Sequence, residues 1–371
     1  MKIQKSNNDL VYVEPADYFP KEIRKQYKLG EYADPPHLDE MKAVMLGHAV
    51  GDALGVPVEF CEREELDDAP VTDMRGFGTY DVPAGSWSDD TSMSLATLDA
   101  LAKRGVGYHE TIDRFLGYSE IMDNFVKWYE KGKYTPIGKA FDIGGTCLAA
   151  ISKYQDEIYG REDFEPAPGL DPALWFGQHD EWSNGNGSLM RIHPLVLYVY
   201  VKNLPFEKWR WIVEFGSMLT HAHDRSIMGC LIYAHVLLYL LSCREKGAVT
   251  RALREAKKNL QSLPEFSHYA RIFEDTFVNL PRESIKSSGY VVDTLEAALW
   301  CLLTTDSYRE CVLKAVNLGD DTDTVAAVAG GLAGALYGYD AIPTEWLDTL
   351  IKREYIEKMC ERAARRWDKK E

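Results

Sequence analysis

The sequence predicts an all-α protein folded as one compact, multi-helix domain. Hydrophobic residues make up 46% of its 371 residues, which is enough for a large core. Apolar residues recur at helical spacing along most of the chain, whereas the alternating pattern of half-buried strands is nearly absent. Gly and Pro follow several of these periodic segments, as they do at helix ends. These patterns predict about twelve helices and give no clear signal for a β-hairpin.

Residues 1–38 differ from the rest, because they combine proline, asparagine and exposed-type aromatic residues without a long helical period. We therefore predict an N-terminal extension over 1–38 and a helical domain over 39–371. Helices are predicted at 39–54, 92–103 and 109–131, from residues 141–146 to about 158, from residues 184–191 onward, and at 209–219, 224–245, 248–261, 265–279, 291–304, 307–317, 322–337 and 344–367. Long loops rich in Asp, Gly and Pro are predicted at 61–85 and 160–186.

Small residues on two of these helices indicate close packing. Gly47 and Gly51 recur on the first helix, and Gly330, Gly334 and Gly338 recur every four residues near the C-terminus. Glycine on one face of a helix lets a neighbouring backbone approach. We expect some part of the chain to approach the first helix closely, and another helix to pack against the glycine face near the C-terminus.

Two acidic stretches open two of the predicted helices. Residues 319–324 hold three Asp and two Thr before an apolar helix, and residues 86–91 hold two Asp beside Ser and Thr. Acids in a first turn complement the helix dipole, so plain capping is one explanation. If the fold brings the stretches together, roughly four or five carboxylates would raise one another's pKa, and a divalent cation would resolve the conflict. The donors are all oxygens, which favours Mg²⁺, Mn²⁺ or Ca²⁺ over Zn²⁺.

Composition argues against two classes of protein. The net charge is −16, the pI is about 5.1, and no block of Lys and Arg appears, so a nucleic-acid binder is not expected. The most apolar run, residues 227–243, is short for a bilayer span and favours a buried core helix over a membrane helix. Seven cysteines without a CxxC pair and a polar N-terminus predict reduced thiols in a cytoplasmic protein.

The order of the motifs resembles the ADP-ribosylglycohydrolase family over about residues 40–340. The motifs are Gly51-Asp52-Ala53-Leu54-Gly55 with Glu59, Trp87-Ser88-Asp89-Asp90-Thr91, Phe141-Asp142-Ile143-Gly144, Asn186-Gly187 to Met190-Arg191 with Pro194, Thr220-His221, and Asp321-Thr322-Asp323-Thr324. Several motifs in one order are a far stronger signal than any single one, so the resemblance favours metal binding over capping. The sequence departs from the family's pattern at Ser88, where Thr is common, and at Asp320, where Gly is common.

The resemblance implies an all-α fold that holds two Mg²⁺ or Mn²⁺ ions in a cleft and hydrolyses the bond between C1″ of ADP-ribose and an acceptor, often arginine. It implies metal ligation by Ser88, Asp89, Asp90, Asp321, Asp323 and Thr324. Glu59 and Asp90 are the candidates for the catalytic carboxylate, and the sequence does not decide between them. The expected substrate contacts are Asp142, Gly144, Gly145, Thr146, Asn186, Gly187, Ser188, Met190 and His221, with backbone N–H groups of the glycine-rich loops on the diphosphate.

The implied partner is an ADP-ribosylated protein. Some family members that protect bacteria from ADP-ribosylating toxins carry an N-terminal extension that plugs the toxin's active site, and residues 1–38 look similar. This predicts binding to a cognate ADP-ribosyltransferase that is lost when residues 1–38 are deleted. The alternatives to arginine-linked hydrolysis are a binding or inhibitor protein, a hydrolase of serine-linked or O-acetyl-ADP-ribose, and a catalytically inactive relative of the kind found among lens crystallins.

Overall fold

The computed structural model describes residues 2–6, 9–13, 37–103, 107–109, 114–160 and 171–367, and it confirms the predicted all-α class. The α-helices are α2 (Leu38–Gly55), α3 (Arg63–Asp68), α4 (Asp89–Lys103), α5 (Tyr118–Lys131), α6 (Gly145–Tyr159), α7 (His193–Val201), α8 (Phe206–Met218), α9 (Asp224–Cys243), α10 (Lys246–Leu260), α11 (Val291–Leu303), α12 (Tyr308–Val316), α13 (Thr322–Tyr337), α14 (Thr344–Thr349) and α15 (Arg353–Trp367). Short 3-10 helices are η1 (Val56–Val58), η3 (Pro172–Trp175), η4 (Pro264–Phe273), η5 (Phe277–Asn279), η6 (Arg282–Ser284) and η7 (Tyr339–Ala341), and the strands are β1 (Lys2–Ser6), β2 (Asp9–Val13), β3 (Gly107–His109) and β4 (Arg114–Leu116).

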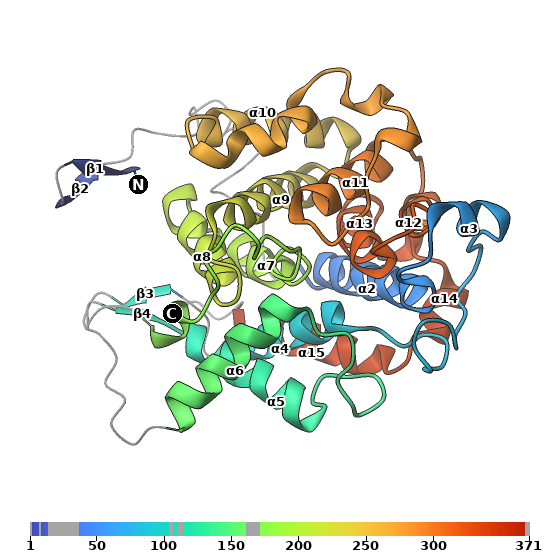
Figure 1. Ribbon diagram of the computed structural model, residues 1–371, viewed down its shortest axis with the longest axis horizontal. Helices are drawn as coiled ribbons and strands as arrows, with labels where there is room; N and C mark the ends of the chain where they lie inside the picture. Colours follow the sequence, from blue (N-terminus) through green and yellow to red (C-terminus); the bar gives the residue numbers. More distant parts are fainter. Residues whose placement is uncertain are drawn as a thin grey trace.

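Helices α2 and α13 lie side by side in the middle of the molecule (Figure 1). Helices α9, α11 and α12 contact α13, while α4 and α15 contact α2. Buried apolar side chains from Met41 to Trp367 join in one hydrophobic cluster. The two helices that begin with acidic stretches, α4 and α13, therefore both pack against α2.

Glycines bring α2 and α13 into backbone contact. A Cβ atom at Gly47 would lie 2.5 Å from the carbonyl oxygen of Gly330, and one at Gly51 would lie 2.1 Å from that of Ala326. Real Cβ atoms essentially never come that close to another heavy atom. The predicted close packing is confirmed at these positions. Gly338 has another task, because it ends α13 with a φ of 85°.

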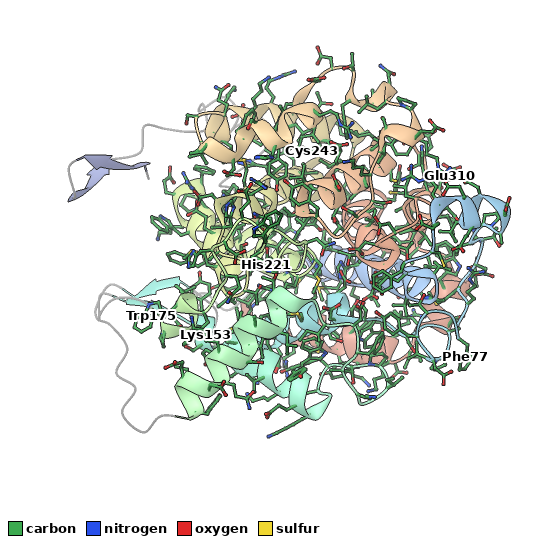
Figure 2. The ribbon with its side chains drawn as sticks, viewed as in Figure 1. Phe77, Lys153, Trp175, His221, Cys243 and Glu310 are labelled. Atoms are coloured by element: carbon green, nitrogen blue, oxygen red, sulfur yellow. The ribbon has the colours of Figure 1, made fainter. Side chains whose placement is uncertain are left out.

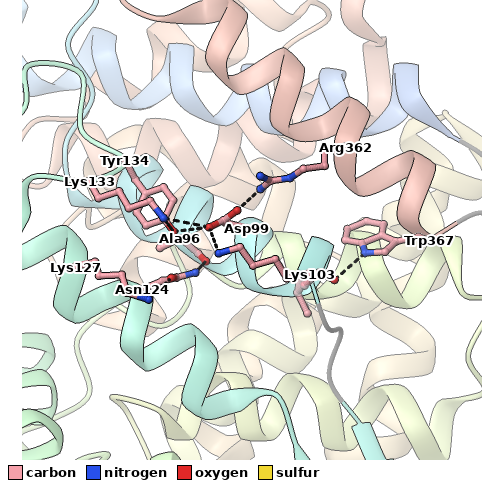
Figure 3. Close-up of polar contacts among 10 residues, drawn as sticks. Ala96, Asp99, Lys103, Asn124, Lys127, Lys133, Tyr134, Arg362 and Trp367 are labelled. Atoms are coloured by element: carbon pink, nitrogen blue, oxygen red, sulfur yellow. Dashed lines mark hydrogen bonds and ion pairs between the residues drawn. The ribbon is translucent and has the colours of Figure 1, made fainter. Parts of the chain in front are cut away.

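Asp99 of α4 ties three segments together (Figure 3). Its carboxylate accepts hydrogen bonds from Tyr134, at 2.6 Å, and from Lys103, at 2.9 Å, and it pairs with Arg362 of α15. Burial alone would raise the pKa of Asp99, but the hydrogen bonds from Tyr134 and Lys103 outweigh it and hold the pKa below its usual range. This cluster fixes α15 against α4.

Two short antiparallel hairpins contradict the prediction that no hairpin forms. The registers pair Lys2 with Val13 in the first hairpin and Gly107 with Leu116 in the second. The helix predicted at 109–131 is wrong over its first part, because α5 begins only at Tyr118. Gly117 precedes it with a φ of 97°, a left-handed conformation that a right-handed helix cannot contain.

The helix predicted at 344–367 is two helices. Lys352 has a φ of 55°, which interrupts the helix between α14 and α15. The backbone N–H of Ile351 instead donates to the carbonyl oxygen of Gly85 at 3.0 Å. This hydrogen bond anchors the segment that leads into the first acidic stretch.

Two further predictions of secondary structure are wrong in detail. Residues 265–279 form the 3-10 helices η4 and η5, in which hydrogen bonds span three residues. The predicted loop at 61–85 contains α3, which Glu62 and Glu65 start with a capping box. The helix predicted to follow residues 184–191 is confirmed as α7, which starts at His193 with Pro194 in its first turn.

Helix α9 contains the apolar run at 227–243. It is the one described helix that is long and apolar enough to cross a membrane, yet 83% of its apolar window is buried inside the protein. This burial agrees with the predicted core helix. Within the predicted extension 1–38, the described residues are two strands and residues 37–38, so its role as a partner-binding arm and the boundary at 38 stay predictions. Residues 161–170 of the predicted loop at 160–186 also lie outside the described residues.

Substituting Gly51 by Ala is expected to destabilise the fold by roughly 3 kcal/mol, because the added methyl group forces α2 away from α13. The control is Gly247→Ala on the exposed face of α10, which should be neutral or stabilising by about 0.5 kcal/mol. Urea unfolding of the two variants measures both effects. Equal stability of both variants would contradict the packing described here.

Candidate active site

A cleft of about 330 Å³ opens where the N-termini of α4, α6 and α13 meet the segment that follows α2. Its lining residues are Glu59, Phe60, Asp89, Asp142, Ile143, Gly144, Gly145, Thr146, Cys147, Gly185, Asn186, Gly187, Met190, His221, Gly289, Asp321 and Thr324. Figure 2 shows His221 near the centre of the molecule. Of the predicted catalytic and substrate residues, only Asp90 and Ser188 are not among those that line the cleft.

Asp52 of α2 positions the start of α4. Its Oδ1 accepts a hydrogen bond from the backbone N–H of Ser88 at 2.8 Å. Its Oδ2 accepts from the backbone N–H of Thr91 at 3.0 Å and from the Thr91 hydroxyl at 2.6 Å. Sequence reasoning quoted Asp52 only as part of a motif and missed this role, because nothing in the local sequence shows which distant amides a buried carboxylate will bind.

The start of α13 is joined to both other helices. The Thr322 hydroxyl donates to the carbonyl oxygen of Gly55 at 2.8 Å, at the end of α2. The Thr324 hydroxyl donates to Oδ2 of Asp90 at 3.1 Å, at the start of α4. Through these bonds the two acidic stretches, which lie more than 200 residues apart in the sequence, meet in space.

The carboxylates form two groups of three that share Asp323. Carboxylate oxygens of Asp52, Asp90 and Asp323 lie within 4.8 Å of one another, and so do those of Glu59, Asp142 and Asp323. An all-oxygen set of this kind suits a hard divalent cation. The two groups could therefore hold metal ions at neighbouring positions.

Unpartnered oxygen atoms support that fit. Within the described residues, Oε2 of Glu59, Oδ1 of Asp90, Oδ1 of Asp321 and Oδ2 of Asp323 are buried without a hydrogen-bond partner. Buried polar atoms in proteins are nearly always satisfied by hydrogen bonds, water or an ion. Four free carboxylate oxygens in one place fit a cation far better than they fit helix capping.

Burial raises the pKa of most of these carboxyl groups. Glu59 rises to about 9, through burial first and then through the charges of Asp142 and Asp321. Asp321 rises to about 6, chiefly through burial. The pKa values of Asp89, Asp90 and Asp323 are also raised, by burial first and then by neighbouring carboxylates. Without a cation, the folded protein thus holds protons on groups that ionise in the unfolded chain.

The structure brings the six predicted metal ligands together. Asp89, Asp321 and Thr324 line the cleft, while Ser88, Asp90 and Asp323 lie buried beneath them. The Ser88 hydroxyl, where the family commonly has Thr, donates to Oδ2 of Asp90 at 3.1 Å. The metal role of all six stays a prediction.

Asp320 does not add its charge to the cleft. It is exposed, and its φ of 65° is the left-handed conformation for which Gly is favoured. Its backbone exchanges hydrogen bonds with Phe60 and Cys61. The backbone conformation, and not the carboxylate, accounts for this position.

Glycine-rich segments form the walls of the cleft. Nothing lies within 4 Å of a Cβ atom placed on Gly144 or Gly145, so the N-terminus of α6 faces open space with its first N–H groups available. Asn186 donates through Nδ2 to Oδ2 of Asp321 at 2.7 Å and so orients an acidic side chain. Ser188 is buried instead, where its hydroxyl oxygen lies 2.9 Å from that of Ser217.

Tyr80 interacts with carboxylates of the cleft, and sequence reasoning missed it. Its hydroxyl interacts with both Asp142 and Glu59, and burial followed by those two charges raises its pKa. Its ring packs against that of Phe141 with centroids 5.1 Å apart. Tyr80 lies in a predicted loop with no periodic pattern, so only the fold could place it beside the acids.

A second groove, of about 480 Å³, continues from the cleft across Gly185 and Gly289, which line both. Trp182 lines this groove and is 95% exposed, and Tyr290 lines it as well. The guanidinium of Arg225 lies 5.9 Å from the centre of the Tyr290 ring. An exposed tryptophan beside a polar cleft offers a flat apolar surface to a ligand that extends out of it.

Comparison with known proteins points to one family. The model of the ADP-ribosylglycohydrolase family matches residues 33–371. A chain from a solved structure titled "ADP-ribosylglycohydrolase-related protein complex" superposes with a TM-score of 0.69 at 30% identity, covering 88% of this chain and 98% of that one.

Characterised relatives are similar over most of their length. The ADP-ribosylarginine hydrolase Tri1 of Serratia proteamaculans is 33% identical over 87% of this chain and 78% of its own. The ADP-ribosyl-[dinitrogen reductase] glycohydrolase of Rhodospirillum rubrum is 32% identical over 85% of this chain and 92% of its own.

Divalent cations are expected to stabilise the protein more at high pH than at low pH. A carboxyl group whose folded pKa is raised contributes stability below its unfolded pKa, near 4, and loses that contribution as the pH rises through the folded value. The EDTA-treated protein should therefore lose stability between about pH 4 and pH 9. Since cations bind the ionised groups, Mg²⁺ or Mn²⁺ at 100 times Kd should raise Tm by roughly 5 °C at pH 8.5 and by less at pH 6.

A matched pair of variants controls this measurement. Asp323 belongs to both carboxylate groups, whereas Asp340 is exposed beyond the other end of α13. Asp323→Asn should reduce the rise in Tm, and Asp340→Asn should retain it. The same rise in both variants would refute cation binding at this site.

Proposed function

The chain belongs to the ADP-ribosylglycohydrolase family, and on that premise we propose that it is a metal-dependent hydrolase that releases ADP-ribose from arginine side chains of modified proteins. The names of two relatives, an ADP-ribosylarginine hydrolase and an ADP-ribosyl-[dinitrogen reductase] glycohydrolase, support a hydrolase of this class. The observation that carries the proposal is the pair of carboxylate groups that share Asp323 in a cleft with glycine-rich walls.

We propose two Mg²⁺ or Mn²⁺ ions as the cofactors, held by Ser88, Asp89, Asp90, Asp321, Asp323 and Thr324. Asp52, Glu59 and Asp142 stand close enough to contribute charge. When bound, such ions supply Lewis acidity and a fixed anchor for sugar hydroxyls.

The diphosphate of ADP-ribose fits the walls of the cleft. The open N-terminus of α6 at Gly144, Gly145 and Thr146 offers backbone N–H groups, and the loop at 185–188 faces it. Backbone donors of this kind attract an anion locally, although the protein as a whole carries a charge of −16.

We assign the proton transfer to Glu59. It lines the cleft, whereas Asp90 lies buried beneath it and accepts hydrogen bonds from the hydroxyls of Ser88 and Thr324. As the acid, Glu59 carries a proton, and burial favours this form by raising its pKa in the cation-free cleft. That proton passes to the guanidine nitrogen as its bond to C1″ breaks. The carboxylate then takes a proton from the water that adds to C1″, which restores Glu59.

The second groove is our proposed site for the adenosine end of the ligand. It continues from the wall that faces the diphosphate, and Trp182 stands there exposed. A purine ring stacks well on a flat aromatic side chain. The ligand would thus run from the carboxylates, past α6, to Trp182.

A cytoplasmic location fits the cysteines, since all seven are unpaired as thiols. A cognate ADP-ribosyltransferase toxin as a second partner, bound through residues 1–38, stays a prediction from the sequence.

The test of the function is release of ADP-ribose from an arginine-ADP-ribosylated protein in Mg²⁺, with EDTA as the comparison. Glu59→Gln should lower kcat at least about 100-fold, because the variant cannot carry the proton. Glu64→Gln, an exposed site on α3, should keep the rate. No release by the wild-type protein, with cation binding confirmed, would refute the arginine linkage and direct the assay to serine-linked or O-acetyl-ADP-ribose.

Truncating Trp182 is expected to weaken ligand binding more than catalysis. Trp182→Ala should raise the Kd for ADP-ribose by about tenfold, through loss of stacking, with a smaller change in kcat. Phe77→Ala removes another exposed aromatic side chain, at the edge of the molecule in Figure 2, and should leave the Kd unchanged. Isothermal titration calorimetry measures the Kd for ADP-ribose of both variants. An unchanged Kd in Trp182→Ala would exclude adenosine from this groove.

A further inference from the structure

Arg191 is a buried cation that lies behind the cleft. Its side chain is fully buried, with the guanidinium 4.9 Å from the centre of the Phe125 ring. Nη1 donates to the carbonyl oxygen of Gly216 at 3.0 Å, and Nη2 donates to the hydroxyl oxygen of Thr220 at 2.7 Å. Within the described residues, its hydrogen-bond partners are thus neutral oxygens. Burying a cation without a carboxylate is costly, so a structural role alone explains the residue poorly.

The hydroxyl of Thr220 joins Arg191 to His221, and the chemistry of arginine fixes which group donates in each hydrogen bond. Arginine only donates, so Oγ1 of Thr220 must accept from Arg191. The hydroxyl proton is then free for Nδ1 of His221, which lies 2.8 Å away. Among the described residues, the other acceptor of the Thr220 hydroxyl is the Cys147 thiol, which is a weak one. Nδ1 therefore accepts a hydrogen bond, and the proton of the neutral imidazole resides on Nε2.

The same arrangement keeps His221 neutral. Burial, and then the charge of Arg191, lower the pKa of His221 to about 3. The backbone of His221 is fixed by two hydrogen bonds with Ser217, from its N–H at 2.8 Å and to its carbonyl oxygen at 2.9 Å. The ring packs along the loop that carries Gly187, where an added Cβ would lie 2.9 Å from Cε1. His221 lines the cleft, and within the described residues its Nε2 has no hydrogen-bond partner.

We propose that Arg191 is a positioning residue that acts on His221 through Thr220. The hydrogen bonds from Arg191 to Thr220 and from Thr220 to His221 fix the imidazole as its Nε2–H tautomer. His221 thereby presents a neutral N–H donor to an oxygen atom of the ADP-ribosyl group. This inference rests on the proposed function for the identity of the ligand. The tautomer itself is a property of the free protein. A donor held this way keeps its proton across the physiological pH range, whereas an ordinary histidine would titrate within it.

The first test reads the tautomer directly. Long-range ¹H–¹⁵N correlation spectra of the nine histidine rings show which nitrogen carries the proton, and His221→Gln identifies the signals of His221. The wild-type protein should show Nε2–H at pH 7. A wild-type ring protonated on Nδ1, or on both nitrogens, would overturn the proposal.

Two variants of Thr220 test the relay. Thr220→Val removes the hydroxyl and should yield a mixture of tautomers, whereas Thr220→Ser restores the hydroxyl and should restore the single Nε2–H form. Arg191→Met removes the upstream donor and should also yield a mixture. If Arg191→Met does not fold, the Thr220 pair still decides, and a Thr220→Val ring that stays purely Nε2–H would refute the relay.

Binding supplies the functional readout. The Kd for ADP-ribose should rise by about tenfold in Thr220→Val and by less than about twofold in Thr220→Ser, as expected for one hydrogen bond. A change in tautomer without a change in Kd would overturn the ligand contact. Failure of the wild-type protein to bind ADP-ribose would count against the proposed function and leave the tautomer result standing.

Discussion

Backbone contact between α2 and α13 is the constraint on which the site depends. Gly55 ends α2 so close to α13 that a Cβ there would lie 2.3 Å from Cα of Asp323. Any larger residue would separate Asp52 on one helix from Asp323 on the other, and with them the first group of carboxylates. The glycines do more than permit packing, because they set the distance between charged groups. The same glycines thus determine both the close packing of the two helices and the spacing of the carboxylates.

Helix capping and metal binding are not equal explanations of the acids. Asp321 stands at the N-cap of α13 without making a side-chain cap hydrogen bond, and its Oδ1 has no hydrogen-bond partner in the part of the chain that the structure describes. Asp52 is the residue that satisfies amides at the start of α4, from a different helix. Asp89 and Asp90 are therefore not needed to cap α4. The helix dipoles favour negative charge at these ends, yet burial raises the carboxyl pKa values, so the dipoles do not offset the cost of desolvation.

The sequence predicted the parts of this site that local patterns encode. Glycine spacing predicted that each of α2 and α13 would have a close neighbour, but not that they would pack against each other. Clustered acids at two helix starts predicted where carboxylates would gather. Features set by distant partners were missed. Helix α15 is separated from α14 because Ile351 hydrogen-bonds to Gly85, and Tyr80 reaches the acids from a loop without periodicity. The role of Asp52 was missed for the same reason, since the backbone N–H groups that donate to its carboxylate lie 36 and 39 residues away in the sequence.

Neutral hydrogen-bond donors allow the negatively charged diphosphate of ADP-ribose to bind beside a group of carboxylates. The ligand carries a diphosphate, yet none of the described residues that line the cleft is Lys or Arg. A cation on this wall would pair with Asp89 or Asp321 and compete with a metal ion for the same oxygens. Backbone N–H groups at the start of α6 compete with a metal ion for these carboxylate oxygens much more weakly, because each N–H group carries only a partial charge. The position of Arg191 follows the same logic: its charge stays behind Thr220, and only a neutral N–H of His221 reaches the cleft.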